Sequence, residues 1–222
     1  MDTYIRRCTD IDIAQNGIPM NIAPKLRPGI FFDRDGTIIA EKNYLKDFEE
    51  IKILPGVIKA LKMLKFANIP FYLVTNQAGV AHGFFDESRL NEVHHYLIKE
   101  LNRLKISLRG IFYCPHHPLA EISEYRQDCH CRKPNPGLLY QAALIDRIDL
   151  QKSYLIGDKL IDIEAGKRAS LKTILVLTGH GRKERAKLTL ESTPDYIAFD
   201  LQQAAAWLLK DLSGKRRLVV EG

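Results

Sequence analysis

Short apolar runs alternate with amphipathic stretches from residue 29 almost to the end of the chain. Runs of apolar residues without polar interruption are typical of strands that are buried on both faces. They predict strands at 30–32, 70–76, 110–114, 153–158 and 172–179, with a possible edge strand at 195–199. Apolar residues three to four positions apart predict helices at 55–68, 86–104, 136–146, 160–169 and 200–212. Strands and helices that alternate in this way predict an α/β fold, a doubly wound parallel sheet.

The two ends of the chain lack this pattern. Residues 1–28 show no clean periodicity and contain Gly17, Pro19, Pro24 and Pro28, so we expect an N-terminal extension that packs over the domain or is partly mobile. Residues 29–213 are expected to form the domain, and residues 214–222 a basic tail.

Composition narrows the classes of protein. The 222 residues are 45% hydrophobic, which is enough for a sizeable core without disulfides. No apolar run approaches the roughly 18 residues that span a bilayer, and no secretory signal is recognisable, so we expect a cytoplasmic protein with no membrane partner. We also expect a monomer. The net charge of +6 is concentrated partly in 181–187 and 214–217. We interpret these runs as solvated surface; a nucleic-acid-binding module is the alternative.

Polar side chains follow several predicted strands directly. Asp33 and Asp35 follow the first strand, Thr75 and Asn76 end the second, and Asp158 ends the fourth. A single carboxylate at such a place is often a helix cap, but several at the ligand-binding edge of a parallel sheet indicate a site. Two neighbouring carboxylates that share Mg²⁺ suit phosphoryl transfer, in which Asp33 attacks phosphorus and Asp35 transfers the proton.

Four motifs support this interpretation by resemblance. DRDGT (33–37), VTNQAG (74–79), CRKPNPG (131–137) and GDKLID (157–162) occur in the order found in the haloacid dehalogenase superfamily of phosphatases, and the sequence resembles that family. The resemblance implies a Rossmann-like fold without a large cap domain. It implies catalytic roles for Asp33, Asp35, Thr75 and Lys133, and Mg²⁺ held by Asp33, Asp35 (through its main-chain carbonyl) and Asp158. Asp162 could orient Lys159 or a metal-bound water; a plain helix surface is the alternative.

Cysteines and histidines cluster just before the third motif. Cys114 and His116 precede Cys129 and Cys131 by a spacer of twelve residues. Three thiolates and one imidazole suit a closed, structural Zn²⁺ site. His117 and His130 are competing ligands, and buried free thiols are the alternative without metal.

The cysteine-rich loop narrows the resemblance to the zinc-containing branch of the superfamily. That branch includes phosphatases of heptose 1,7-bisphosphate, to which the loop is most similar, and of histidinol phosphate, which remains the alternative. The resemblance implies a small phosphorylated sugar as substrate and no nucleic-acid partner. The residues expected to bind it are Glu41, Lys42, Asn43, Tyr44, Thr75, Asn76, Gln77, Arg132, Lys133 and Lys159.

Overall fold

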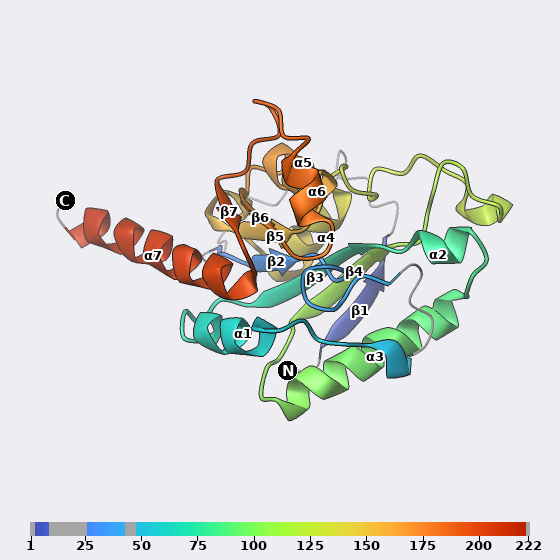
Figure 1. The fold of residues 1–222 in the computed structure, drawn as a ribbon, viewed down its shortest axis with the longest axis horizontal. Helices are drawn as coiled ribbons and strands as arrows, with labels where there is room; N and C mark the ends of the chain where they lie inside the picture. The colour runs from blue at the N-terminus through green and yellow to red at the C-terminus, as the bar shows by residue number, and fades with distance from the viewer. Residues whose placement is uncertain (1–2, 9–25, 43–47, 221–222) are drawn as a thin grey trace, which may run out of the picture.

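The computed structural model describes residues 3–8, 26–42 and 48–220, and its centre is one parallel sheet (Figure 1). The strands are β1 (Tyr4–Arg7), β2 (Ile30–Phe32), β3 (Phe71–Asn76), β4 (Gly110–Cys114), β5 (Tyr154–Gly157), β6 (Lys172–Val176) and β7 (Tyr196–Ala198). Their order across the sheet is β1-β4-β3-β2-β5-β6-β7, and every pairing is parallel. The predicted fold class is therefore confirmed, and all carboxyl ends of the strands meet at one edge.

Helices cover both faces of this sheet. They are α1 (Val57–Lys65), α2 (Ala78–Ala81), α3 (Glu87–Arg103), α4 (Gly137–Asp146), α5 (Leu160–Arg168), α6 (Gly181–Arg185) and α7 (Leu201–Val220), with short 3-10 turns at Phe48–Glu50, Ser123–Tyr125 and Leu150–Lys152. Successive side chains of a strand point to opposite faces. Accordingly, Ile30 and Phe32 pack with residues of α1, α3 and α7, whereas Phe31 packs with residues of α4 and α5.

Local signals place the main elements close to their predicted positions. Asp86 caps α3 by accepting a hydrogen bond of 2.7 Å from the backbone amide of Arg89. The exposed cations of the run 181–187 lie on and just after α6, a short helix that was not predicted. α7 continues to Val220, into the segment expected to be a tail.

β1 is the main addition to the predicted elements. It lies within the segment expected to be an extension and pairs with β4 as the edge strand. Its residues are partly buried or, for Arg6, exposed, and they include two arginines, so it lacks the continuous apolar run that indicates a buried strand.

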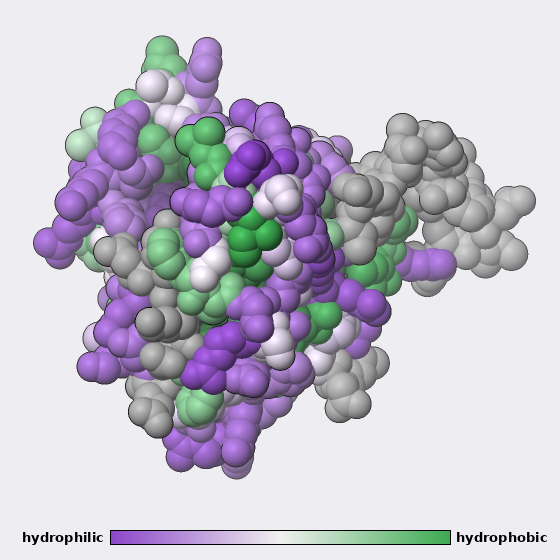
Figure 2. Space-filling view, turned by 90° about the vertical axis from the view of Figure 1, so that its right-hand side faces the viewer, coloured by the Kyte–Doolittle hydropathy of each residue, from purple (hydrophilic) through white to green (hydrophobic). Residues whose placement is uncertain are grey.

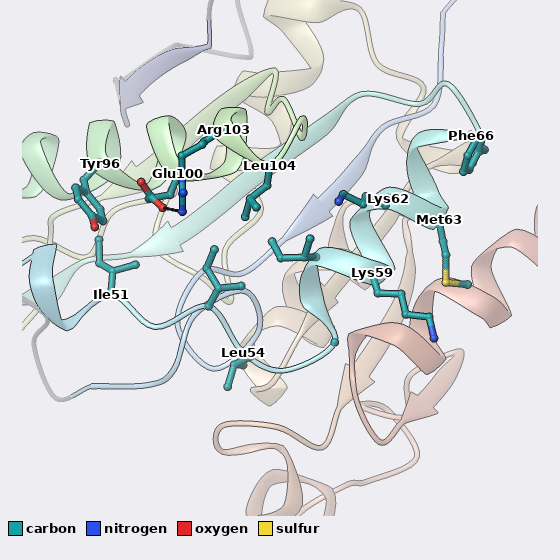
Figure 3. Close-up of a pocket in the computed structure, with 13 residues that line it drawn as sticks. Ile51, Leu54, Lys59, Lys62, Met63, Phe66, Tyr96, Glu100, Arg103 and Leu104 are labelled. Carbon is teal, nitrogen blue, oxygen red and sulfur yellow. Dashed lines mark hydrogen bonds and ion pairs between the residues drawn. The ribbon is translucent and has the colours of Figure 1, made fainter.

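The surface of the molecule combines a largely hydrophilic face with a pocket. Figure 2 shows a face on which hydrophilic residues predominate, with hydrophobic residues in small patches. A pocket of about 860 Å³ opens between α1, α3 and the loop before α1 (Figure 3), and its lining contains none of the strand-end carboxylates. Within the described residues, no helix has the length and hydropathy needed to cross a bilayer.

Candidate active site

The turn after β2 brings the first motif against the end of β5. The backbone amide of Asp33 donates to the carbonyl of Ile156 at 2.9 Å. Gly36 follows in the left-handed region, with φ of 79°, and a Cβ there would lie 2.2 Å from Oδ2 of Asp158. Only glycine tolerates both the backbone angle and this approach, so Gly36 allows the two acidic motifs to meet.

Lys133 lies at the centre of the site and is almost fully buried. Its Nζ donates to Asp33 Oδ1 at 2.7 Å and to the carbonyl of Val74 at 2.8 Å, and it lies 2.5 Å from Asp162 Oδ1. Burial lowers the pKa of Lys133, but its two carboxylate partners outweigh burial and leave that pKa raised. The ammonium group therefore stays charged and can neutralise a phosphoryl group bound at Asp33.

Three buried carboxylates form a group that fits a divalent cation. Oxygen atoms of Asp33, Asp158 and Asp162 all lie within 4.8 Å of one another. Burial, together with the neighbouring carboxylates, raises the pKa of Asp33 to about 6 and that of Asp158 to about 8. Oδ1 of Asp158 is buried without a hydrogen-bond partner. Mg²⁺ prefers oxygen ligands, so it would reduce the repulsion between these carboxylates and give the Asp158 oxygen a partner.

Asp35 turns its carboxylate to another set of partners. Arg34 donates to it through Nε and Nη2, the latter at 2.9 Å from Oδ2, and Gln77 Nε2 donates to Oδ2 at 3.0 Å. The same Gln77 nitrogen lies 2.8 Å from the hydroxyl oxygen of Thr75. The side-chain amide of Gln77 thus links two predicted catalytic residues, Asp35 and Thr75, at the strand-end edge of the sheet.

A buried arginine bonds to Asp35 and also contacts a buried histidine, and neither residue was identified from the sequence. Arg34 is only 1% exposed, and its Nη1 lies 3.1 Å from Nε2 of His94 in α3. Burial, and then the charge of Arg34, lower the pKa of His94 well below its ordinary value, so the neutral ring can accept this bond. The helical pattern of α3 predicts the burial of His94 but carries no signal for its partner.

Asp162 and Asn76 both position neighbours of Asp33. Asp162 is fully buried and its Oδ2 accepts the backbone amide of Lys159 at 3.1 Å, so the alternative of a plain helix surface is wrong. Asn76 forms two hydrogen bonds of 3.0 Å with the backbone of Lys133, one to its carbonyl and one from its amide. The spacing within the motifs contains no signal for this pairing.

The remaining residues expected to bind substrate surround this centre at different depths. Lys159 Nζ donates to Glu41 at 2.7 Å, and His180 Nε2 lies 3.3 Å from the same carboxylate. Lys42 lies 3.5 Å from Glu50. Asn43 and Tyr44 lie outside the described residues.

The predicted zinc loop brings thiols and one imidazole together beside the site. The mutually close donors are Cys8, Cys114, His116 and Cys129, which are all buried and whose ligand atoms lie within 4.8 Å of one another. Cys131 is buried as well, and its thiol contacts that of Cys8.

The competing histidines lie outside this donor group. His130 is exposed, and the ring of His117 lies tilted against that of His82, with ring centres 4.8 Å apart. Soft thiolates and an imidazole are the donor set that zinc prefers, so these side chains fit that metal.

Arg132 joins the loop to the carboxylate site. Its Nη1 donates to the carbonyl of His116 at 3.0 Å, and the next residue is Lys133. Asn135 Nδ2 donates to the carbonyl of Cys129 at 3.2 Å. The loop and Lys133 are therefore adjacent in both sequence and space.

Comparisons with known proteins agree with this chemistry. A family model described as HAD-hydrolase-like matches residues 130–204. The chain is 37% identical over 187 residues to the D-glycero-beta-D-manno-heptose-1,7-bisphosphate 7-phosphatase of Salmonella typhi, covering 84% of this chain and 92% of the relative. It is 40% identical over 175 residues to the enzyme of that name from Pasteurella multocida, covering 77% and 95%.

A solved structure is similar over the same region. It is the D,D-heptose 1,7-bisphosphate phosphatase of B. bronchiseptica in complex with magnesium and phosphate, with a TM-score of 0.74 and 34% identity. The match covers 83% of this chain and 99% of that chain.

Proposed function

Because the chain belongs to the haloacid dehalogenase-like family of the heptose 1,7-bisphosphate 7-phosphatases, we propose that it removes the 7-phosphate of D-glycero-D-manno-heptose 1,7-bisphosphate. The enzyme is a phosphoric monoester hydrolase, and this step belongs to the synthesis of the lipopolysaccharide core heptose. The observation that carries the proposal is the Asp33 carboxylate at the strand-end edge, held at 2.7 Å by the buried Lys133 beside two further buried carboxylates.

Asp33 is the nucleophile of the proposed mechanism. Its carboxylate attacks phosphorus to form an aspartyl phosphate, while Lys133 and the hydroxyl of Thr75 bind the phosphoryl oxygens. Asp35 donates a proton to the departing sugar oxygen and then takes one from the water that hydrolyses the intermediate. The bonds from Arg34 and Gln77 fix the position of the Asp35 carboxylate for these two proton transfers.

We propose Mg²⁺ as the cofactor, because it fits the group of three buried aspartates. The similar solved structure is a complex with magnesium and phosphate. Asp33, Asp158 and the main-chain carbonyl of Asp35 would hold it. Asp162, which sequence reasoning left outside the ligand set, is close enough to act as an additional or water-mediated ligand. When bound, the ion supplies positive charge that screens the carboxylates from one another and from the phosphate.

Substrate recognition is assigned to the cations around this centre. Lys159 and Arg132 carry the charge for a second phosphate, and Glu41 holds Lys159 in place through its bond of 2.7 Å. Arg132 depends on the cysteine-rich loop, which we assign to a structural zinc ion on Cys114, His116, Cys129 and one further thiolate. The sequence pattern names Cys131 as that thiolate.

A phosphate-release panel tests the proposed function. Purified protein with Mg²⁺ is given heptose 1,7-bisphosphate, histidinol phosphate and a 3′-phosphorylated oligonucleotide at equal concentration, with Asp33→Asn as the inactive control. We expect the highest kcat/KM for the heptose bisphosphate, with heptose 1-phosphate as the product. A preference for histidinol phosphate, or release of the 1-phosphate, would contradict the substrate assignment. Activity retained by Asp33→Asn would contradict the mechanism.

A further inference from the structure

The edge strand β1 delivers a cysteine to the metal loop from the other end of the chain. β1 pairs with β4 in parallel from Tyr4 opposite Gly110 to Arg7 opposite Tyr113, and the amide of Cys8 continues the ladder by donating to Tyr113 at 2.9 Å. This register makes Cys8 the neighbour of Cys114, the first residue of the loop's donor group. Side chains at matched positions of neighbouring strands point to the same face, so both thiols enter one space.

Side chains of β1 fit this position closely. A Cβ on Gly110 would lie 2.5 Å from the ring of Tyr4, so the glycine makes room for that ring. The Tyr4 hydroxyl bonds to the buried Asp146, and Thr3 donates to the carbonyl of Leu108 at 2.6 Å. Gln141 also donates to the carbonyl of Arg7 at 3.1 Å. The segment that carries Cys8 is therefore anchored to β4, to the residues before β4 and to α4.

The distances within the donor group suit one tetrahedral ion. Zinc–sulfur bonds of about 2.3 Å separate tetrahedral thiolates by about 3.8 Å, and a nitrogen ligand is slightly closer. Cys8 Sγ lies 3.3 Å from His116 Nδ1, Cys114 Sγ lies 3.8 Å from the same nitrogen, and the Cys114 and Cys129 sulfurs are 3.2 Å apart. Small adjustments would bring these atoms to coordination distances.

The loop and β1 supply more potential zinc ligands than one tetrahedral zinc ion can bind. Five buried donors converge on a site that takes four ligands, and the four that are mutually within 4.8 Å include Cys8 rather than Cys131. We infer that Cys8 is a zinc ligand, completing the site with Cys114, His116 and Cys129. The ion then fastens the N-terminal edge strand to the loop that carries Arg132. The inference concerns metal binding alone and is independent of which phosphate ester the enzyme hydrolyses.

The test compares Cys8→Ser with Tyr4→Phe. Tyr4→Phe is the matched control, because it weakens the anchoring of the same strand while leaving every sulfur in place. Each protein is loaded with zinc, analysed for metal content and mixed with a chromophoric chelator that reports zinc release. Loss of a residue that hydrogen-bonds to a metal ligand commonly lowers metal affinity about 10- to 100-fold. Loss of the ligand itself should therefore speed zinc release from Cys8→Ser at least about tenfold. Tyr4→Phe should release zinc at close to the wild-type rate.

Hydrogen exchange of the β1 amides gives a second readout. Removing zinc from the wild-type protein should speed exchange in β1, whereas in Cys8→Ser the presence of zinc should make no difference there. Zinc content and release in Cys8→Ser equal to those of the wild type would overturn the inference and leave Cys131 as the ligand. Wild-type protein without zinc would overturn it as well.

A measurement on the wild type keeps the inference testable if Cys8→Ser fails to fold. In cadmium-substituted protein, correlation NMR links the metal to the Cβ protons of each cysteine that binds it. Coupling to Cys8 would support the inference. Coupling to Cys114, Cys129 and Cys131 without coupling to Cys8 would overturn it.

Discussion

Replacing Asn76 by alanine should separate the positioning of Lys133 from its chemistry. The asparagine side chain forms two hydrogen bonds of 3.0 Å with the backbone of Lys133 and none of its atoms is needed for the proposed proton or phosphoryl transfers. Each lost hydrogen bond costs about 0.5–1.5 kcal/mol, so the free energy of unfolding should fall by about 1–3 kcal/mol. The Lys133 ammonium keeps Asp33, Asp162 and Val74 as partners, so it should remain in the site but lose its fixed distance from phosphorus.

The expected kinetic result is a lower kcat with a smaller change in KM. Misplacement of a catalytic group by about 1 Å can cost on the order of 10² in rate, which is the upper bound for Asn76→Ala. The assay is steady-state phosphate release with saturating Mg²⁺, together with urea unfolding of the same samples.

Asn135→Ala is the matched control for this change. Asn135 also forms two hydrogen bonds, to the carbonyl of Cys129 at 3.2 Å and from Arg168 at 3.0 Å, but neither reaches Lys133. It should lose a similar amount of stability and keep the wild-type kcat. Asn76→Ala with wild-type kcat and reduced stability would refute the reasoning, because Asn76 would then stabilise the fold without positioning the lysine.

Three further predictions concern the nucleophile, the carboxylate group and the metal loop. Asp33→Asn should abolish turnover while circular dichroism stays at wild type, because the amide is a poor nucleophile; activity above a few per cent would contradict covalent catalysis. In protein without Mg²⁺ but with its zinc retained, the raised pKa values of Asp33 (about 6) and Asp158 (about 8) mean that the folded state binds more protons than the unfolded chain. The melting temperature should therefore fall as pH rises from about 5 to 8, and Mg²⁺ should reverse the fall; in Asp158→Asn the part of the fall above about pH 7 should disappear, and a fall there as steep as in the wild type would contradict this origin. Cys129→Ser should lose zinc and raise KM more than it lowers kcat. The loop holds Arg132 through the carbonyl of His116, whereas Lys133 is held by Asn76 outside the loop. A decrease in kcat as large as the increase in KM would contradict this separation of the two cations.

The sequence predicts the parts of this molecule that depend on local pattern. Continuous apolar runs locate the central strands, since a strand covered on both faces needs apolar residues at every position. The strand-end position of Asp33, Thr75 and Asp158 follows from that sheet, because parallel strands present their carboxyl ends at one edge. The resemblance of the motifs then supplies roles that spacing alone does not.

Contacts between distant segments were not predictable in the same way. Cys8 meets Cys114 only because β1 adds to the sheet edge, and β1 has a charged, partly exposed pattern that resembles a loop as much as a strand. Asp162 occupies a helical position whose burial depends on the approach of Gly157, where a Cβ would lie 2.3 Å from its Oδ2. Local periodicity predicts the helix but carries no information about that approach.

Two neighbouring cations of the third motif are supported by different parts of the fold. Lys133 is bound by Asn76 at the end of β3 and by Asp162 in α5, so its position depends on the sheet and its covering helix. Arg132 is bound to the loop that begins at the end of β4 and that we assign to zinc. The cation that we propose to stabilise the transition state is thus attached to the sheet and to α5. The cation that we propose to bind the remainder of the substrate, Arg132, is attached to the metal loop through the carbonyl of His116. We therefore expect changes in the metal loop to act mainly on KM and changes at the strand ends to act mainly on kcat, because each cation depends on a different part of the fold.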